Sequence, residues 1–407
     1  MTNNIFSKFF LLALILYPIS PKIGFDGFYL YPSDLIILFL FSLSIFFKKN
    51  NTFFKDIIIL NIYLILAIFS TFIFFDSIER FHFTYLKQLF FLTITIYIID
   101  FIQFNDYEKI IKLILYSWAF IIFLNLSYII LYYVINNPTE FDSLFRYESK
   151  YRLTGLTGSG YNLITNEFFS PFTGNELGTT TVPLSILLSL LFFISLSSKN
   201  NLTYLILLLI FLIGTIFTMS RSGILVILIG ICTLFFIKGA MNPLIKLLVI
   251  LFLLLICFLL FEPSFLFGLE KLNFTQTSKF ITVSLRQDLW LDAINFLFSN
   301  PLSALFGIHI TGFNVSDVIG IDYAESLFFD LFLHFGLFGI IYFGYLFYSL
   351  FYKINNLENF ISSYHLNIGL KIFFPGFLLA NFFSGSPIFA DFIFSIFFFF
   401  IYISRKQ

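Results

Sequence analysis

The sequence has few charged residues and almost no cysteine. Only 11% of its 407 residues are charged, against about 25% in a typical soluble domain. Its 23 basic residues balance 23 acidic ones, so the formal net charge is zero. These figures exclude a soluble globular enzyme, a disordered chain and a protein that binds nucleic acid through its net charge.

The two cysteines do not form a pattern typical of a disulfide framework or a metal site. Cys232 and Cys257 each lie inside a long apolar run, so we expect both to be small buried hydrophobic side chains. The first twenty residues are apolar but lack a small-x-small cleavage site, which predicts a retained first membrane span.

Long hydrophobic runs dominate the chain. Hydrophobic residues make up 59% of it, 66 positions are phenylalanine, and the mean hydropathy is +0.95. A helix needs roughly 20 apolar residues to cross a bilayer core, and lipid leaves no partner for unpaired backbone groups. The sequence therefore predicts an all-α integral membrane protein, a single polytopic domain with about twelve transmembrane helices near 5–20, 33–47, 56–75, 83–102, 109–135, 178–197, 201–218, 221–237, 242–261, 323–351, 366–383 and 387–403.

The lysines predict the orientation of these spans. With twelve spans both termini lie on one side, and twelve of the 17 lysines fall on that side. Short cytoplasmic loops collect positive charge, so the termini are expected to be cytoplasmic. Two larger loops, 136–177 and 262–322, then face the opposite, outer side.

The arginines show the opposite bias, because five of the six fall on the predicted outer side. A guanidinium binds phosphate oxygens with fixed geometry, which favours an anionic ligand there, such as a lipid diphosphate. The alternative is ordinary surface charge. No phosphate-binding loop motif stands in a strand–helix context, so any chemistry is expected on the outer face with a donor that is already activated.

Two segments offer groups for an anion at helix entries. Arg152 lies in a glycine-containing stretch, and Asn175 stands before Gly178 at the mouth of a span. Free backbone N–H groups at such an entry favour anions, although simple helix capping is the alternative. Ser220 and Arg221 form a polar turn between two spans, where a lone arginine can also be an interfacial anchor.

The second large loop contains a predicted amphipathic helix. Leu285, Leu289, Ala293 and Phe296 follow helical spacing, and Arg286 and Asp292 lie on other faces. Such a helix would lie at the membrane interface and stop before Pro301.

A fourth polar segment opens the span at 323–351. Tyr323 and Glu325 precede a long apolar helix that contains Asp330 and His334. Ionisable groups within a span are costly, so Asp330 and His334, four residues apart, are expected to face the bundle interior or a wet cavity.

In this order, the four segments resemble the O-antigen polymerase and O-antigen ligase superfamily. Its pattern has an arginine–glycine loop leading to an Asn-x-x-Gly helix entry, a Ser-Arg-x-Gly turn, an Arg…Trp…Asn-Pro-Leu segment and a signature before a Phe-Gly-Leu-x-Gly helix. The counterparts here are 152–178, 220–223, 286–307 and 325–339. Ligases carry His-Asn where this chain has Glu325 and Ser326, which favours a polymerase.

The resemblance implies a GT-C-like glycosyltransferase in the bacterial inner membrane with its active site facing the periplasm. Its expected partners are an oligosaccharide linked to undecaprenyl diphosphate and membrane lipid, with no nucleic acid. A chain-length regulator protein would be a further partner.

The hypothesis assigns a role to each polar residue. Arg152, Arg221 and Arg286 would neutralise the departing diphosphate, and Glu325 would be the general base. Trp290 and Tyr323 would stack on sugar rings, and Asn175 and Ser220 would contact substrate. No Asp-x-Asp or histidine cluster stands in the outer loops, so neither a metal nor another cofactor is expected.

Three alternatives stay open. The first is a ligase that transfers finished glycan to lipid A core. The second is a flippase or secondary transporter, although no inverted repeat is evident and the polar residues gather at one face. The third concerns the base, which could be Asp330 or His334 in place of Glu325.

Overall fold

The computed structural model describes about two thirds of the chain, and its described part is mainly helical. The described residues are 2–16, 22–25, 28–47, 54–74, 80–99, 101–102, 107–136, 160–162, 167–169, 181–197, 202–218, 220–236, 277–308, 313, 315–320, 326–356 and 364–383. They form the helices α1 (Thr2–Leu16), α2 (Pro32–Ile45), α3 (Phe54–Phe74), α4 (Arg80–Ile99), α5 (Tyr107–Asn136), α7 (Thr181–Ser197), α8 (Leu202–Phe217), α9 (Arg221–Phe236), α11 (Thr277–Ser299), α12 (Pro301–Phe306), α14 (Val315–Ile319), α15 (Leu327–Asn356) and α16 (Tyr364–Phe383).

Ten of the twelve predicted spans coincide with observed helices. The predicted break between 201–218 and 221–237 is confirmed, because α8 ends at Phe217 and α9 begins at Arg221. The predicted spans 242–261 and 387–403 lie outside the described residues. The helical character of the protein was thus readable from its apolar runs.

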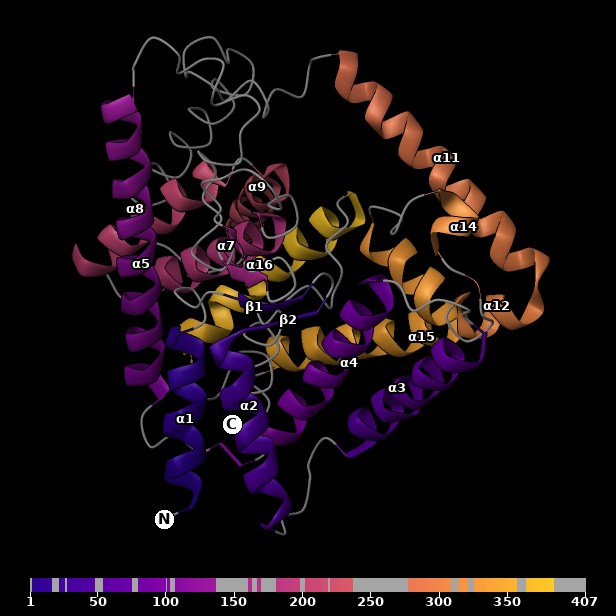
Figure 1. The fold of residues 1–407 in the computed structure, drawn as a ribbon. Helices are drawn as coiled ribbons and strands as arrows, with labels where there is room; N and C mark the ends of the chain where they lie inside the picture. Colours follow the sequence, from indigo (N-terminus) through magenta and orange to yellow (C-terminus); the bar gives the residue numbers. More distant parts are fainter. Residues whose placement is uncertain are drawn as a thin grey trace.

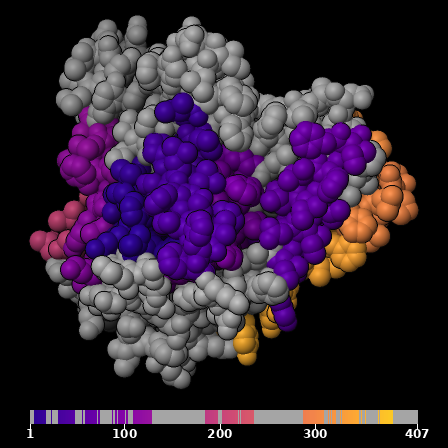
Figure 2. Space-filling view, turned by 60° about the horizontal axis from the view of Figure 1, so that its bottom comes forward, coloured from indigo at the N-terminus to yellow at the C-terminus, as the bar shows by residue number. Residues whose placement is uncertain are grey.

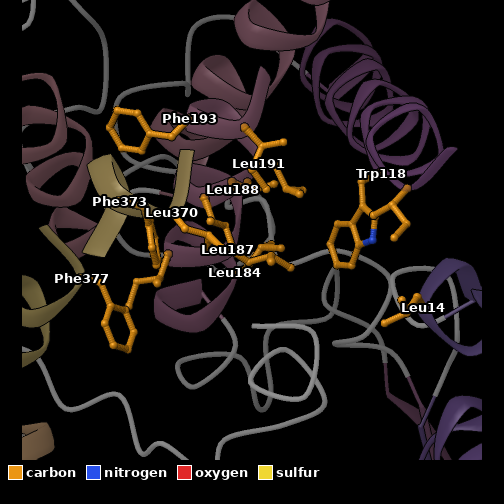
Figure 3. Packing of buried hydrophobic residues seen from close by; sticks show 14 of the residues in the cluster. Leu14, Trp118, Leu184, Leu187, Leu188, Leu191, Phe193, Leu370, Phe373 and Phe377 are labelled. Atoms are coloured by element: carbon orange, nitrogen blue, oxygen red, sulfur yellow. The ribbon is translucent and has the colours of Figure 1, made fainter. Parts of the chain in front are cut away.

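Helix α7 lies at the centre of the bundle. Every residue from 184 to 195 is buried, and α7 packs against α8, α9 and α16. In Figure 1 the helices α7, α9 and α16 lie together at the centre, with α11 along the upper right edge. Figure 3 shows four leucines of α7 with Phe373 and Phe377 of α16 on one side and Trp118 of α5 on the other.

Glycines allow α16 to approach its neighbours closely. A Cβ atom at Gly376 would lie 2.6 Å from the carbonyl oxygen of Val226 in α9, and one at Gly369 would lie 2.9 Å from the Cα atom of Ile194 in α7. Small residues permit such backbone contacts between helices in membranes, where packing must replace the hydrophobic drive. These contacts make α7, α9 and α16 one tightly packed unit.

The outward faces of several helices are also apolar. Helix α3 buries Leu60, Tyr63 and Ala67 on one face and exposes Ile62, Ile65 and Phe69 on another. Figure 2 shows the N-terminal helices, coloured indigo to purple, spread over one face of the molecule. A helix that is apolar all round suits a lipid environment.

Hydropathy and length agree with an α-helical membrane protein. Among the described residues, the stretches Lys109–Ser127 and Phe328–Tyr345 are long and apolar enough to cross a membrane, and seven shorter apolar helices accompany them. The apolar outer surface and these helices support the predicted membrane location.

A small sheet is the part of the fold that the sequence analysis did not predict. The strands β1 (Lys22–Phe25), β2 (Phe28–Leu30), β3 (Gly160–Asn162) and β4 (Glu167–Phe169) lie in the order β2-β1-β3-β4. β1 pairs parallel with β3, with Ile23 opposite Tyr161. The sheet joins two loops that were predicted to lie on the same, outer side. Strands of three or four residues carry little periodicity, which is why the sequence did not reveal them.

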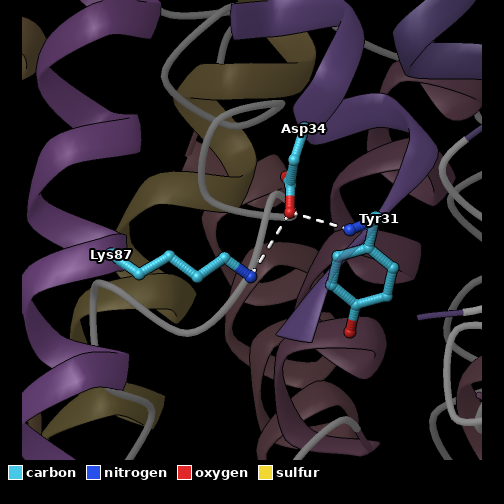
Figure 4. A network of polar contacts seen from close by, with 3 residues as sticks. All are labelled: Tyr31, Asp34 and Lys87. Atoms are coloured by element: carbon cyan, nitrogen blue, oxygen red, sulfur yellow. Dashed lines mark hydrogen bonds and ion pairs between the residues drawn. The ribbon is translucent and has the colours of Figure 1, made fainter. Parts of the chain in front are cut away.

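A buried ion pair stands beside this sheet. The Lys87 Nζ of α4 lies 3.3 Å from the Asp34 Oδ2 of α2, with side chains 12% and 4% exposed. The same carboxylate oxygen accepts the backbone N–H of Tyr31 at 3.0 Å (Figure 4). The ammonium also lies 5.3 Å from the centre of the Tyr31 ring, a cation–π distance. Asp34 thus connects the first turn of α2 to α4.

One expectation about cysteine was wrong. Cys232 is a free thiol on α9, and it is exposed, not buried. One face of α9 packs against α16 and α7, and Cys232 lies on its outward face. The apolar run around Cys232 therefore includes residues of the apolar outer surface as well as residues of the core. Cys257 lies outside the described residues.

Candidate functional site

The turn between α8 and α9 is polar and buried. The Thr218 hydroxyl donates to the Thr215 carbonyl oxygen at 2.6 Å, and the backbone N–H of Ser220 donates to the Thr218 hydroxyl oxygen at 3.3 Å. Ser220 is 6% exposed, and its own hydroxyl has no hydrogen-bond partner among the described residues. The unpartnered hydroxyl and the positive end of the α9 dipole therefore meet at one place.

Arg221 is the first residue of α9. Its backbone is described, and its side chain lies outside the described part of the structure. The free backbone N–H groups at such a helix N-terminus favour an anion. Its predicted contact with diphosphate stays a prediction.

The helix predicted in the second large loop is present as α11. It ends at Ser299, just before Pro301. Ala293 is fully buried and Asp292 is exposed, but Leu291 and Phe298 are exposed as well, so the amphipathic character of this helix stays a prediction. The backbone of Arg286 lies in α11, and its side chain is outside the described part.

Trp290 is stacked on a protein ring. Its indole lies 4.8 Å from the centre of the Phe329 ring of α15, with an interplanar angle of 10°. Phe329 therefore covers one face of the indole that was predicted to stack on sugar, so Trp290 also has a structural role. Trp290 is half-buried, and its predicted contact with sugar stays a prediction.

The stack belongs to a second apolar cluster, separate from the main core. It unites α11, α14 and the first two turns of α15, and its buried members are Ala293, Leu297, Ile308, Val315, Ile319, Phe332 and Leu333. The main core takes Leu331 and Phe335 from the same stretch of α15. The beginning of α15 is thus held between two apolar clusters.

Two glycines lock the second large loop onto α15. Asn300 caps α12 by accepting the Leu302 N–H at 3.0 Å, and α12 ends at Gly307 with φ +86. A Cβ atom at Gly307 would lie 2.3 Å from the His334 carbonyl oxygen, and one at Gly336 would lie 2.5 Å from that of Leu305. We call this reciprocal backbone contact the glycine lock. It brings the Asn-Pro-Leu segment and the Phe-Gly-Leu-x-Gly segment together, although they are about 30 residues apart.

Three buried polar side chains follow one face of α15 at successive turns. Ser326, Asp330 and His334 are 0%, 3% and 6% exposed, and the Asp330 N–H donates to the Ser326 carbonyl oxygen at 2.7 Å. Within the described part of the chain, the hydroxyl of Ser326 has no hydrogen-bond partner. The prediction that Asp330 and His334 face the interior is confirmed. We call these three residues the polar stripe.

The described residues bring some of the predicted site residues together and not others. Trp290 lies against Phe329, the residue before Asp330 of the polar stripe. Helix α9, which begins just after Ser220, packs against α7, α8 and α16, and no large contact within the described part joins α9 to α11 or α12. Helix α16 connects the two regions, because it packs against both α9 and α15.

Four predicted site residues lie outside the described residues: Arg152, Asn175, Tyr323 and Glu325. Glu325 directly precedes Ser326, so the residue proposed as base stands in sequence at the head of the polar stripe. Among the described residues, no group of three His, Cys, Asp or Glu side chains could hold a metal ion.

The sequence analysis missed the residues that position this site. The glycine lock had a signal in the two Phe-Gly pairs, Phe306-Gly307 and Phe335-Gly336, but nothing showed that they meet. Ser189 of α7, whose hydroxyl donates to the Gly223 carbonyl oxygen of α9, had no such signal in the sequence, because serines recur along the apolar run of α7.

Comparison with known proteins gives one family match. Residues 205–344 match a family model described as O-antigen ligase. This range contains most of α8, all of α9, α11, α12 and α14 and the larger part of α15, and therefore the polar turn, the glycine lock and the polar stripe. Arg152 and Asn175 precede it. No curated protein matched the chain.

Proposed function

Because this match places the chain in the O-antigen polymerase/ligase superfamily, we propose that the protein polymerises lipid-linked oligosaccharide repeat units into a surface polysaccharide. The donor is a repeat unit on undecaprenyl diphosphate, and the acceptor is the non-reducing end of another repeat. The reaction takes place on the periplasmic face of the inner membrane.

The observation that carries the proposal is the packing of the second large loop, through α11 and α12, against the beginning of α15. Trp290 from α11 stacks on Phe329, and the glycine lock fixes α12 to the same stretch. The polar stripe begins there, with two ionisable side chains in an otherwise apolar helix. Buried ionisable groups in membrane helices mark functional sites by default, because their burial is costly.

The proposed reaction is a displacement at the anomeric carbon of the donor. An acceptor hydroxyl oxygen forms the new glycosidic bond while the bond from this carbon to the phosphate oxygen breaks, and the diphosphate leaves with the electron pair. Glu325 takes the hydroxyl proton. Arg221, Arg286 and Arg152 stabilise the charge that develops on the diphosphate.

The polar turn supports a diphosphate near α9. A buried hydroxyl without a partner is costly, and Ser220 offers one at the positive end of a helix. A phosphate oxygen would accept hydrogen bonds from this hydroxyl and from the backbone N–H groups of the first turn.

A ligase is the second candidate, because the matching family model is described as O-antigen ligase. The polymerase is preferred because Glu325 and Ser326 stand where ligases carry His-Asn. A change of residue type at the position of the base fits a different acceptor.

Deletion of the gene in its native strain is expected to reduce the surface glycan to one repeat unit per acceptor lipid, as seen after separation by size. Loss of all glycan from the acceptor would identify a ligase, and loss of exported repeats would identify a transporter. An unchanged ladder would contradict all three.

Complementation with Arg221→Ala or Glu325→Gln is expected to lower the rate of polymerisation about 100-fold, the usual effect of losing one group that stabilises transition-state charge or transfers a proton. The matched control is Arg80→Ala, which removes an arginine of the same predicted side that lies outside the four segments. Normal polymerisation by a properly inserted Arg221→Ala protein would refute the assigned role.

A further inference from the structure

The first turn of α9 lies against the backbone of α7. A Cβ atom at Gly223 would lie 2.6 Å from the Ser185 Cβ and 2.9 Å from the Ser185 carbonyl oxygen. Real Cβ atoms do not approach so closely, so glycine at this position allows the contact. Gly223 is the third residue of α9, so this contact with α7 lies within one helical turn of the polar turn.

A hydroxyl of α7 reaches across this contact. The Ser189 Oγ lies 2.7 Å from the Ser185 carbonyl oxygen and 3.0 Å from the Gly223 carbonyl oxygen, and Ser189 is fully buried. A serine hydroxyl has one proton to donate, so its two acceptors on neighbouring helices share it. In a buried apolar setting, the hydrogen bond from Ser189 to Gly223 is stronger than in water and favours one arrangement of the two helices.

The other side of the turn is held by α8. Thr218 is fully buried, its hydroxyl donates to Thr215, and its hydroxyl oxygen accepts the Ser220 N–H. A Cβ atom at Gly223 would also lie 2.8 Å from the Thr215 Cγ2. The segment that carries the unpartnered Ser220 hydroxyl and the beginning of α9 is thus fixed from two helices.

We propose that Ser189 is a positioning residue for diphosphate binding. It holds the Gly223 carbonyl, and with it the first turn of α9, at the place where Ser220 and Arg221 meet the departing diphosphate. This inference rests on the proposed function and adds to it a residue in α7, outside the matched range and outside the four segments.

The test uses purified full-length protein in nanodiscs, with transfer measured at several concentrations of lipid-linked donor. Inorganic diphosphate is the competing probe. Ser189→Ala is expected to raise the KM for the donor and the half-inhibiting concentration of diphosphate up to roughly fivefold, the most that one lost hydrogen bond can supply, with a modest fall in unfolding temperature. Ser195→Ala is the matched control, because Ser195 is equally a buried serine of α7 but donates to the Leu191 carbonyl oxygen of its own helix, at 2.9 Å.

Each outcome bears on the inference. A normal KM and normal diphosphate inhibition in Ser189→Ala would overturn it. So would equal effects in Ser189→Ala and Ser195→Ala, or a lowered unfolding temperature with unchanged diphosphate inhibition, since these indicate a merely structural serine. Arg221→Ala separates the two levels: if it too is normal, the proposed diphosphate site falls, whereas an impaired Arg221→Ala with a normal Ser189→Ala rejects only the positioning role.

A second pair of variants tests the same contact by overpacking. Gly223→Ala is expected to impair donor use more than Ser189→Ala, because its methyl group meets Ser185. Ser185→Gly in the same chain removes the Cβ that lies 2.6 Å away and should restore part of the donor affinity. A Gly223→Ala protein that uses the donor as well as the parent protein does would contradict the inferred contact.

Discussion

Replacement of Gly336 by alanine is expected to abolish polymerisation and to strongly reduce the amount of folded protein. Gly336 has φ +66 and ψ −161 inside α15, a backbone conformation that costs an L-residue about 1–3 kcal/mol. Its new Cβ would lie 2.5 Å from the Leu305 carbonyl carbon and oxygen. Backbone atoms cannot rotate away, so overpacking adds about 1–3 kcal/mol. The measurements are the yield and unfolding temperature of detergent-extracted protein and the glycan ladder in cells.

The matched control is Gly344→Ala in the same helix. A Cβ atom there meets nothing within 4 Å, and Gly344 is exposed. Alanine favours a helix by about 1 kcal/mol over glycine, so this variant should be as stable as the parent or slightly more so. Gly307→Ala, on the other side of the glycine lock, should resemble Gly336→Ala, because its Cβ would lie 2.3 Å from the His334 carbonyl oxygen. If Gly336→Ala behaves like Gly344→Ala, the lock does not hold α12 to α15.

Replacement of Asp34 by asparagine is the second large effect. The substitution keeps an oxygen that can accept the Tyr31 N–H, but it removes the charge 3.3 Å from the Lys87 ammonium. Breaking a buried ion pair from one side costs about 3–5 kcal/mol, because the other charge stays behind in a poorly hydrated place. We expect a value near the lower end, since Lys87 is 12% exposed. The measurement is the unfolding temperature in nanodiscs.

The double variant Asp34→Asn with Lys87→Met distinguishes the ion pair from general disruption. Removing both charges relieves the buried ammonium, so the double variant should be more stable than Asp34→Asn alone. Lys55→Met, at an exposed lysine of α3, should change the stability by less than about 0.5 kcal/mol. Additive losses in the double variant would show that the two side chains do not stabilise each other.

The candidate site divides into residues that the sequence revealed and residues that it did not. Asp330 and His334 were predicted to face inward because charge in an apolar helix is costly, and both are buried. Trp290 was predicted to stack on sugar, and the structure shows Phe329 against one of its faces. No local pattern indicates which ring lies next to an indole, because that partner comes from another helix.

The helices follow from the sequence alone because each satisfies its backbone hydrogen bonds internally and therefore needs only a long enough apolar run. That local requirement gave the bounds of α8 and α9. The polar residues between their two apolar runs indicated the turn, and the helical spacing of apolar residues in the second large loop indicated α11. The same local residue types gave the superfamily resemblance.

Only the tertiary structure decided how these pieces meet. The sheet that joins 22–30 to 160–169, the Asp34–Lys87 pair, the glycine lock and the contact of Ser189 with Gly223 all depend on segments far apart in the chain. In a chain with so few charges, the helices pack through close backbone contacts and a few buried polar contacts. Lipid is as apolar as the side chains, so burying apolar side chains between helices does not by itself drive association. Which glycine faces which carbonyl depends on the axial shift and rotation of whole helices, which no local pattern in the sequence records.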